Sequence, residues 1–256
     1  MSTLRLLYAG WRFHMKSLTL SGFFILTSVI QPVIFASVAY FMFEAGARAG
    51  TLLYVALGAG MMGIWSSTLF GSGGAIQWQR WQGTLEYSIA VPPPLLLVIV
   101  PLTLATASIG LYSLTATLFW GWLFFDVPLD VANPAAFAVA LPAAVIGLGL
   151  LGLVLASTFV LYRNANALSN LLEFPVWLVT GLLISLSLLP VWVGPISWIL
   201  APTWGINALR EAAIGGNPWP EIGMCLLLGG VYLVIGHFAL QHFEKLARER
   251  ATLAIA

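Results

Sequence analysis

The sequence predicts an all-α integral membrane protein with about six transmembrane helices, an N-terminal amphipathic interfacial helix and two short re-entrant helices before the last span. Of its 256 residues, 60% are hydrophobic and 7% are charged, whereas a soluble domain carries about 25% charged residues. Apolar runs long enough to cross a bilayer recur along the whole length. We therefore expect residues 1–256 to form a single transmembrane domain.

Residues 2–17 are expected to form the interfacial helix. One side carries apolar residues at helical spacing: Leu4, Leu7, Trp11, Met15 and Leu18. The other side is basic, with Arg5, Arg12 and Lys16. Such a helix lies in the headgroup layer on the cytoplasmic side, although a plain cytoplasmic extension of the first span would contain the same residues. The apolar run that follows is too long for a signal peptide.

Six apolar runs are the predicted spans, separated by short polar segments. They cover about Leu18–Phe43, Thr51–Ala75, Leu95–Phe124, a glycine-rich run that ends near Tyr162, Leu168–Leu189 and Ile222–Leu240. Glycines and serines in the second run allow close packing of helices, because small residues let backbones approach where lipid offers no hydrophobic drive for association.

Residues 190–220 are apolar and aromatic, but prolines and glycines interrupt every run before it reaches spanning length. We expect two short helices here that dip into the outer leaflet or lie on it. The tryptophans of this segment would then lie at headgroup depth.

Lysine and arginine predict the orientation, because they are enriched in cytoplasmic segments. With the N-terminus inside, the inner segments hold Arg5, Arg12, Lys16, Arg80, Arg163, Lys245, Arg248 and Arg250. The outer segments hold only Arg48 and Arg210. We therefore expect a multi-pass protein of the plasma (inner) membrane with both termini in the cytoplasm.

The chain shows no catalytic constellation, so we do not expect an enzyme. Cys225 is the single cysteine and lies in an apolar run, which leaves it as a small core residue. The three histidines (His14, His237 and His242) have no carboxylate at ligand spacing, so no metal site is expected. No phosphate-binding glycine loop is present either. If ATP drives this protein, another chain must bind it. A net charge of +1 gives no reason to expect nucleic acid as a partner.

The most informative stretch is Gln82-Gly83-Thr84-Leu85-Glu86, which lies between Arg80 and Pro92 on the expected cytoplasmic side after the second span. It resembles the signature of ABC-2-type permeases, the membrane subunits of ATP-binding-cassette exporters for drugs, lipids, polysaccharides and related cargo. The resemblance covers nearly the whole chain. It includes Pro175 and Gly181 in the fifth run, and Pro190, Pro202 and Arg210 in the outer segment.

The resemblance implies that residues 76–92 form a cytoplasmic coupling segment that docks on an ATPase subunit. Its coupling residues would be Arg80, Gly83, Thr84, Leu85 and Glu86. The broken segment 190–220 resembles the re-entrant helices that cap the export path. Glutamines and tryptophans at 77–82 replace charged residues that are commoner in the family, which is compatible with one member of an unequal pair. From the residues alone, an ordinary interfacial loop is the alternative.

Glu173 is the only acidic residue well inside an apolar run. Because a charge is costly within a membrane, we expect it to face protein or a water-filled cavity. With Pro175 it is a candidate for the translocation path or for gating. A pair with Arg163 and exposure to cytoplasmic water are the alternatives.

The function expected from these features is that of a permease subunit of an ATP-driven exporter. A second permease, identical or related, would complete the path, and separate ATPase subunits would hold ATP and Mg²⁺, so no cofactor is expected on this chain. An ion-gradient-driven transporter, which would need internal repeats or charges near the midplane, is one alternative. A membrane assembly or immunity protein without transport is the other. The sequence does not name the cargo.

Overall fold

The structure is a computed structural model that describes residues 3–20, 22–46, 51–81, 95–161 and 165–250. Within these ranges, only the backbone is described for residues 22–29, 73–81, 159–161, 165–166, 243–244 and 246–250. The described chain is helical and contains no strand. The expected all-α fold is therefore confirmed.

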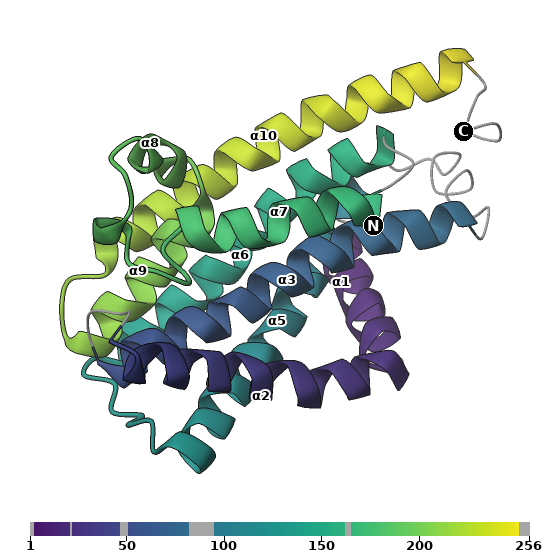
Figure 1. Cartoon of the computed structure of the whole chain (residues 1–256). Coiled ribbons are helices and arrows are strands. Elements are labelled where there is room, and N and C mark those ends of the chain that lie inside the picture. The colour runs from purple at the N-terminus through teal and green to yellow at the C-terminus, as the bar shows by residue number, and fades with distance from the viewer. Residues whose placement is uncertain (1–2, 21, 47–50, 82–94, 162–164, 251–256) are drawn as a thin grey trace.

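The helices follow one another with short connections. They are α1 (Thr3–Thr19), α2 (Gly22–Glu44), α3 (Leu52–Trp81), α5 (Leu96–Phe125), α6 (Pro134–Leu161), α7 (Ala165–Val179), the 3-10 helix η1 (Leu186–Leu188), α8 (Val193–Trp198), α9 (Ala201–Ile214) and α10 (Trp219–Arg250). The long helices run roughly side by side, while α1 runs across them (Figure 1).

Helix α3 is the centre of the bundle. It packs against α2, α5, α6, α7 and α9, and 83% of the residues in an 18-residue stretch of its apolar segment Leu52–Ser72 are buried. The corresponding share for Trp219–His242 of α10 is 33%, so α10 lies at the periphery. Any displacement of α3 must therefore disturb most of the bundle.

Small residues bring α3 and α5 into close contact. A Cβ added at Gly60 would lie 2.2 Å from Leu114 Cδ1, and one added at Gly63 would lie 2.0 Å from Ser113 Oγ. On the α5 side of the same contact, a Cβ added at Gly110 would lie 2.5 Å from Ile64 Cα of α3. These distances leave no room for a side chain, which confirms that the glycines of the second run serve helix packing.

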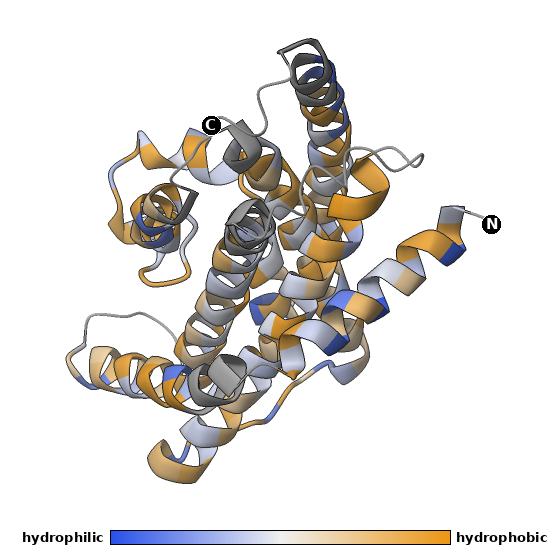
Figure 2. Ribbon diagram, turned by 90° about the vertical axis from the view of Figure 1, so that its right-hand side faces the viewer, coloured by the Kyte–Doolittle hydropathy of each residue, from blue (hydrophilic) through white to orange (hydrophobic). Residues whose placement is uncertain are grey.

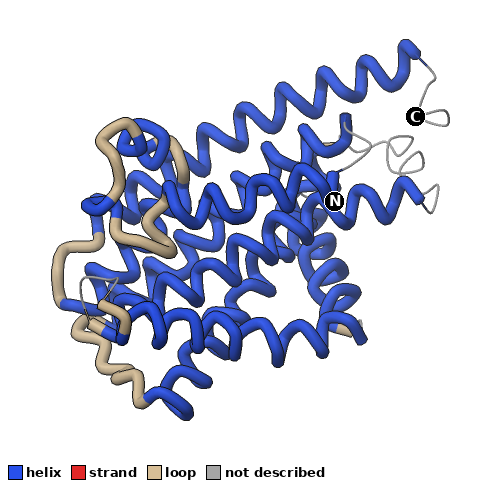
Figure 3. The backbone as a smooth tube through the Cα atoms, in the orientation of Figure 1, coloured by secondary structure: helices blue, strands red, loops and turns tan. Residues whose placement is uncertain are grey.

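The two ends of the bundle differ. One end, which we call the loop end, contains the connections 126–133, 180–192 and 215–218 (Figure 3). Backbone hydrogen bonds join the start of α6 to the end of α9 there, from Ala132 N to Ala213 O and from Asn133 N to Ala212 O. Asn133 Oδ1 also accepts from Ala136 N at 3.0 Å and so caps α6. At the opposite end, which we call the tail end, the helices α3, α6 and α10 terminate.

Helix α1 crosses the tail-end half of α5. Trp11 Nε1 donates to Ser108 Oγ at 3.1 Å, and a Cβ on Gly10 would lie 3.0 Å from Pro101. Leu4 and Tyr8 remain exposed. Figure 2 shows hydrophilic and hydrophobic residues on different sides of this helix, as expected for the amphipathic N-terminal segment.

Four helices are long and apolar enough to cross a membrane: Leu52–Ser72, Leu96–Phe125, Pro134–Thr158 and Trp219–His242. They correspond to the second, third, fourth and sixth predicted spans. The first and fifth runs also form helices, but their described apolar parts are shorter, Ile30–Glu44 in α2 and Ala167–Val179 in α7. A total of six spans therefore stays a prediction.

Several boundaries differ from those expected. Helix α3 continues to Trp81 and takes in the first residues of the predicted coupling segment. The fifth helix does not reach Leu189, because α7 ends at Val179 and Gly181 adopts a left-handed conformation with φ +78°. Segment 190–220 contains the two expected short helices, α8 and α9, together with the start of α10.

Candidate functional site

Glu173 lies on the buried face of α7, where its carboxyl group meets α3. Ser66 Oγ donates to Glu173 Oε1 at 2.7 Å, and both side chains are buried. One turn earlier on α7, Ser169 Oγ donates to Leu69 O at 3.5 Å. Polar groups thus join α7 to α3 at successive turns. Arg163, the alternative partner for Glu173, lies outside the described residues.

Three aromatic rings pack together at this part of α7. Trp177 follows Glu173 by one turn, on the same buried face. Its ring meets Phe35 of α2 edge-on, with centroids 5.9 Å apart, and Phe174 at 5.0 Å. Trp177 Nε1 is buried and has no hydrogen-bond partner among the described residues. The Glu173 site, as we call Glu173, Ser66, Phe35, Phe174 and Trp177, therefore lies between α2, α3 and α7.

Pro175 lies within α7, but on its exposed side. Because proline has no amide hydrogen, it removes one hydrogen bond from the helix and weakens the turn before it. The structure therefore does not place Pro175 in contact with the Glu173–Ser66 pair. Any effect of Pro175 on the Glu173 site must act through the shape of α7.

Arg210 makes a second polar junction, nearer the loop end. Its side chain is only 5% exposed. The guanidinium donates from Nη1 to Gly181 O at 2.9 Å and from Nε to Tyr54 O at 3.3 Å. Its Cζ also lies 3.7 Å from the centroid of the Tyr54 ring, which adds a cation–π contact. Arg210 on α9 thus joins the outer part of α3 to the turn that ends α7.

A glycine makes room for this junction. A Cβ on Gly58 would lie 2.7 Å from Arg210 Nη2 and 2.4 Å from Leu182 O. The charge pattern of the sequence assigns Arg210 to an outer segment, and the structure shows that its side chain is buried within the bundle. Arg210 lies in a segment whose helices are interrupted by glycines and prolines. Such breaks leave backbone carbonyl groups without helical partners, and these carbonyls need donors. The position of Arg210 in this segment was therefore the sequence feature that could have indicated its buried role.

Tyr232 of α10 holds the turn between α8 and α9. Its hydroxyl donates to Ile199 O and accepts from Ala201 N at 3.1 Å. Cys225 Sγ lies 3.7 Å from Ala201 O and 3.5 Å from Ala143 O of α6. At 1.5 Å per residue, Tyr232 lies about 20 Å along α10 from Trp219. The α8–α9 turn therefore sits deep against the bundle, while α9 ends at the loop end.

Of the predicted coupling residues, the structure describes only Arg80, which lies at the tail end. Arg80 belongs to the last turn of α3, where the structure describes the backbone. Gly83, Thr84, Leu85 and Glu86 lie outside the described residues. The role assigned to these residues stays a prediction, and α3 is the element that leads into them.

The described part of the chain offers no group of three His, Cys, Asp or Glu residues that could hold a metal ion. His14 lies half-buried on α1, and this burial lowers the pKa of its imidazole below the usual value of 6.5. The neutral side chain is therefore favoured where α1 packs on the bundle.

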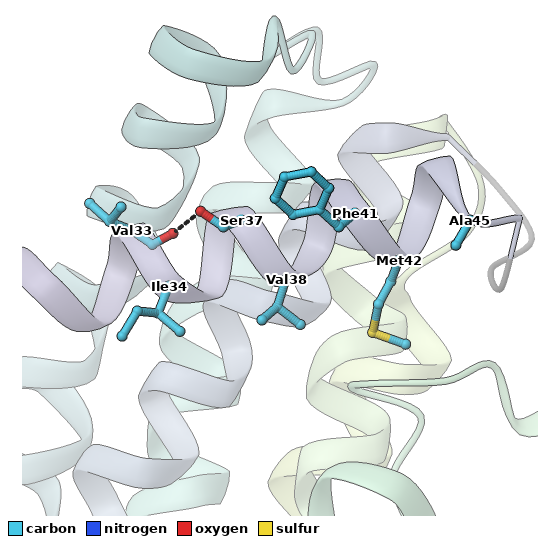
Figure 4. Close-up of a pocket in the computed structure, with 7 residues that line it drawn as sticks. All are labelled: Val33, Ile34, Ser37, Val38, Phe41, Met42 and Ala45. Carbon is cyan, nitrogen blue, oxygen red and sulfur yellow. Dashed lines mark hydrogen bonds between the residues drawn. The ribbon is translucent and has the colours of Figure 1, made fainter.

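An open groove runs along the outer face of α2. It is lined by Val33, Ile34, Ser37, Val38, Phe41, Met42 and Ala45. Ser37 Oγ donates to Val33 O at 2.8 Å, so its hydroxyl is already satisfied and the groove is apolar (Figure 4). Such a surface suits lipid chains or another apolar helix.

Comparison with known proteins identifies a family for most of the chain. No curated protein matches the chain at a significant level. The family description "ABC-2 type transporter" matches residues 5–214, a range that begins in α1, includes the Glu173 site and residues 76–92, and ends at the last residue of α9. On this evidence, the chain belongs to the ABC-2 type transporter family.

Proposed function

We propose that this chain is the permease subunit of an ATP-driven ABC exporter. It forms the translocation path with a second permease, identical or related. Separate ATPase subunits bind ATP and Mg²⁺ and drive it, and the chain itself is not an enzyme. Membership of the ABC-2 type transporter family supports the transporter class. The central position of α3 in the bundle is the observation that supports coupling between the ATPase and the membrane helices.

Helix α3 connects the two junctions described above with the coupling segment. From Trp81 at its tail end, the Ser66 contact is about 22 Å away along the helix and the Tyr54 contact about 40 Å away. Because α3 is largely buried and packs on five other helices, a push at residues 76–92 would reach Glu173 and Arg210 without a flexible link. This supports residues 76–92 as the docking segment for the ATPase.

The same proposal gives an orientation. The tail end faces the cytoplasm of the plasma membrane, and the loop end faces outward. Helices α8 and α9 then form a re-entrant cap, which the deep contacts of Tyr232 and Cys225 support. Irregular backbone at membrane depth is tolerated where it packs on protein, and the α8–α9 turn has such packing.

Replacement of Glu86 by arginine tests the coupling role. We expect Glu86→Arg to release the ATPase or to uncouple ATP hydrolysis from transport, because it reverses a charge at the docking surface. The membrane fold should stay intact, since the change lies outside the spans. The measurements are co-purification of the ATPase in mild detergent and ATP-dependent transport by proteoliposomes.

Asp130→Arg is the matched control, because it reverses an acidic charge that is exposed at the loop end. We expect this variant to retain both the ATPase and transport. Normal ATPase binding and transport by Glu86→Arg would show that the role of Glu86 is wrong. Failure of the unmodified chain to co-purify with any ATPase would count against the exporter proposal itself.

A further inference from the structure

We propose that the Glu173 site recognises the positively charged group of an organic cation and so selects cationic cargo. The inference rests on the proposed exporter function and names the chemical class of its cargo. Three features of the described residues carry it: a carboxyl group with one hydrogen-bond donor, aromatic rings on the same stretch of α7, and an exposed edge.

The carboxyl group has unused capacity to accept hydrogen bonds. Ser66 Oγ is its one hydrogen-bond donor among the residues that the structure describes. A carboxylate offers about four lone-pair sites, so one hydroxyl leaves most of them without a partner. Because a buried charge in a membrane protein normally has a partner or marks a substrate path, a cationic ligand would complete this site.

The rings supply the second half of a cation site. Trp177 lies one turn beyond Glu173 on the buried face of α7, with Phe35 and Phe174 packed edge-on against it. Cations bind favourably over aromatic faces, and most strongly over tryptophan. Trp177 Nε1 has no hydrogen-bond partner in the described part of the chain, which is a further sign that the site lacks a component. A carboxyl group and a tryptophan one turn apart on the same buried face of α7 therefore favour an organic cation over a small hydrated ion.

A metal ion fits this set of residues less well. Calcium and magnesium need about six or more oxygen ligands, whereas Glu173 brings one carboxyl group and Ser66 one hydroxyl that is already used. An organic cation needs only one counter-charge and apolar surface. The residues thus favour an alkylated or arylated ammonium or phosphonium group.

The site also has an edge through which such a molecule can approach. Phe174, next to Glu173 on α7, is 60% exposed, and Leu171 on the same side is 67% exposed. An amphipathic cation could place its apolar part against these side chains and its charge toward Glu173. The apolar part would bind whether or not the charge is recognised, so the test must separate the two.

Tetraphenylphosphonium and tetraphenylborate make this separation, because they have nearly the same shape and opposite charge. Binding of each would be measured by equilibrium dialysis on the permease–ATPase complex in lipid nanodiscs, with empty nanodiscs as the blank. We expect tetraphenylphosphonium to bind and Glu173→Gln to weaken this binding at least about tenfold. Asp130→Asn, which removes an exposed carboxylate at the loop end, should leave it unchanged.

Equal binding of the two probes, or unchanged tetraphenylphosphonium binding by Glu173→Gln, would overturn the proposal. Ser66→Ala provides a second variant that keeps the charge, and we expect it to weaken binding less than Glu173→Gln does. ATP-dependent transport is measured separately on the same complex. If transport of any cargo persists while the cation result is negative, only the cargo class is wrong. If the complex transports nothing with ATP, the exporter proposal fails as well.

Discussion

Arg210 places a guanidinium group in the interior of a helix bundle, where its cost must be offset by specific contacts. The backbone carbonyls of Gly181 and Tyr54 accept from it, and the Tyr54 ring covers it. The Gly181 carbonyl belongs to the turn that ends α7, where a regular helix would have used it internally. Arg210 thus both satisfies a broken backbone and ties α9 to α3 and α7.

Arg210→Met should destabilise the fold, because methionine fills space but cannot donate to the two carbonyl groups. Hydrogen bonds from a charged donor contribute about 1.5–3 kcal/mol each, so we expect the free energy of unfolding to fall by at least about 2 kcal/mol. Thermal unfolding of the purified protein in detergent measures this. Lys16→Met, which removes an exposed charge from α1, should have little effect. Equal stability of both variants would show that the junction is not stabilising.

Glycine substitutions test the same junction by crowding it. Gly58→Ala puts a Cβ within 2.4 Å of Leu182 O, a backbone atom that cannot move aside easily. Gly230→Ala on α10 meets nothing within 4 Å, and alanine favours helix by about 1 kcal/mol over glycine. We expect the first change to lower the unfolding temperature and the second to raise it or leave it unchanged.

Among the elements, α8 and α9 depend most on contacts from elsewhere in the chain. Helix α8 spans only Val193–Trp198, which is too short to be stable alone. Neither helix has a side-chain cap at its start. The Tyr232 hydroxyl donates to Ile199 O at the end of α8 and accepts from Ala201 N at the start of α9, and so supplies the cap that the start of α9 lacks.

Tyr232→Phe should therefore loosen the α8–α9 turn without changing the apolar packing. Cys225 is a native reporter, because it is 0% exposed and lies against Ala201 O. Loss of about 1–2 kcal/mol from the turn should speed the reaction of Cys225 with N-ethylmaleimide by about 5–30-fold. Tyr8→Phe, on the exposed side of α1, should leave the rate unchanged. An unaltered rate in Tyr232→Phe would rule out the capping role.

The elements also show what local sequence can and cannot predict. Hydropathy located α3, α5, α6 and α10 to within a few residues, except where α3 and α10 continue past their apolar part. It placed the end of the fifth helix about ten residues too late, at Leu189 instead of Val179. The residues from Thr180 to Leu189 are mostly apolar. The helix ends before them in a turn that is stabilised by a hydrogen bond from Arg210, a residue far along the chain, to Gly181 O. Hydropathy contains no information on such a contact.

The candidate site shows the same division. The cost of a charge in a membrane singled out Glu173, and the structure places it against protein, as expected. Its partner Ser66 and the ring of Phe35 come from other helices, so they depend on how α2, α3 and α7 pack. Sequence spacing on one helix could have indicated only Trp177, one turn from Glu173.

For the whole molecule, the two ends of the bundle carry the information on orientation. With the side chain of Arg210 buried in the bundle, Arg48 is the only basic residue of the predicted outer loops that remains. The basic residues of the predicted inner segments whose side chains the structure describes are exposed: Arg5, Arg12, Lys16 and Lys245. The burial of Arg210 therefore strengthens the charge bias that predicts a cytoplasmic tail end.

Cysteine labelling of intact cells tests this orientation, and the native protein is a suitable background because Cys225 is fully buried. Asp130→Cys lies in the exposed connection between α5 and α6 at the loop end, and we expect a membrane-impermeant maleimide to label it. Ala254→Cys should react only after the cells are permeabilised, since the C-terminus is expected inside. Labelling of Ala254→Cys in intact cells would reverse the orientation and place residues 76–92 where no cytoplasmic ATPase could reach them. The topology and the coupling proposal therefore stand or fall together in this experiment, whereas the contacts of Glu173 and Arg210 do not depend on it.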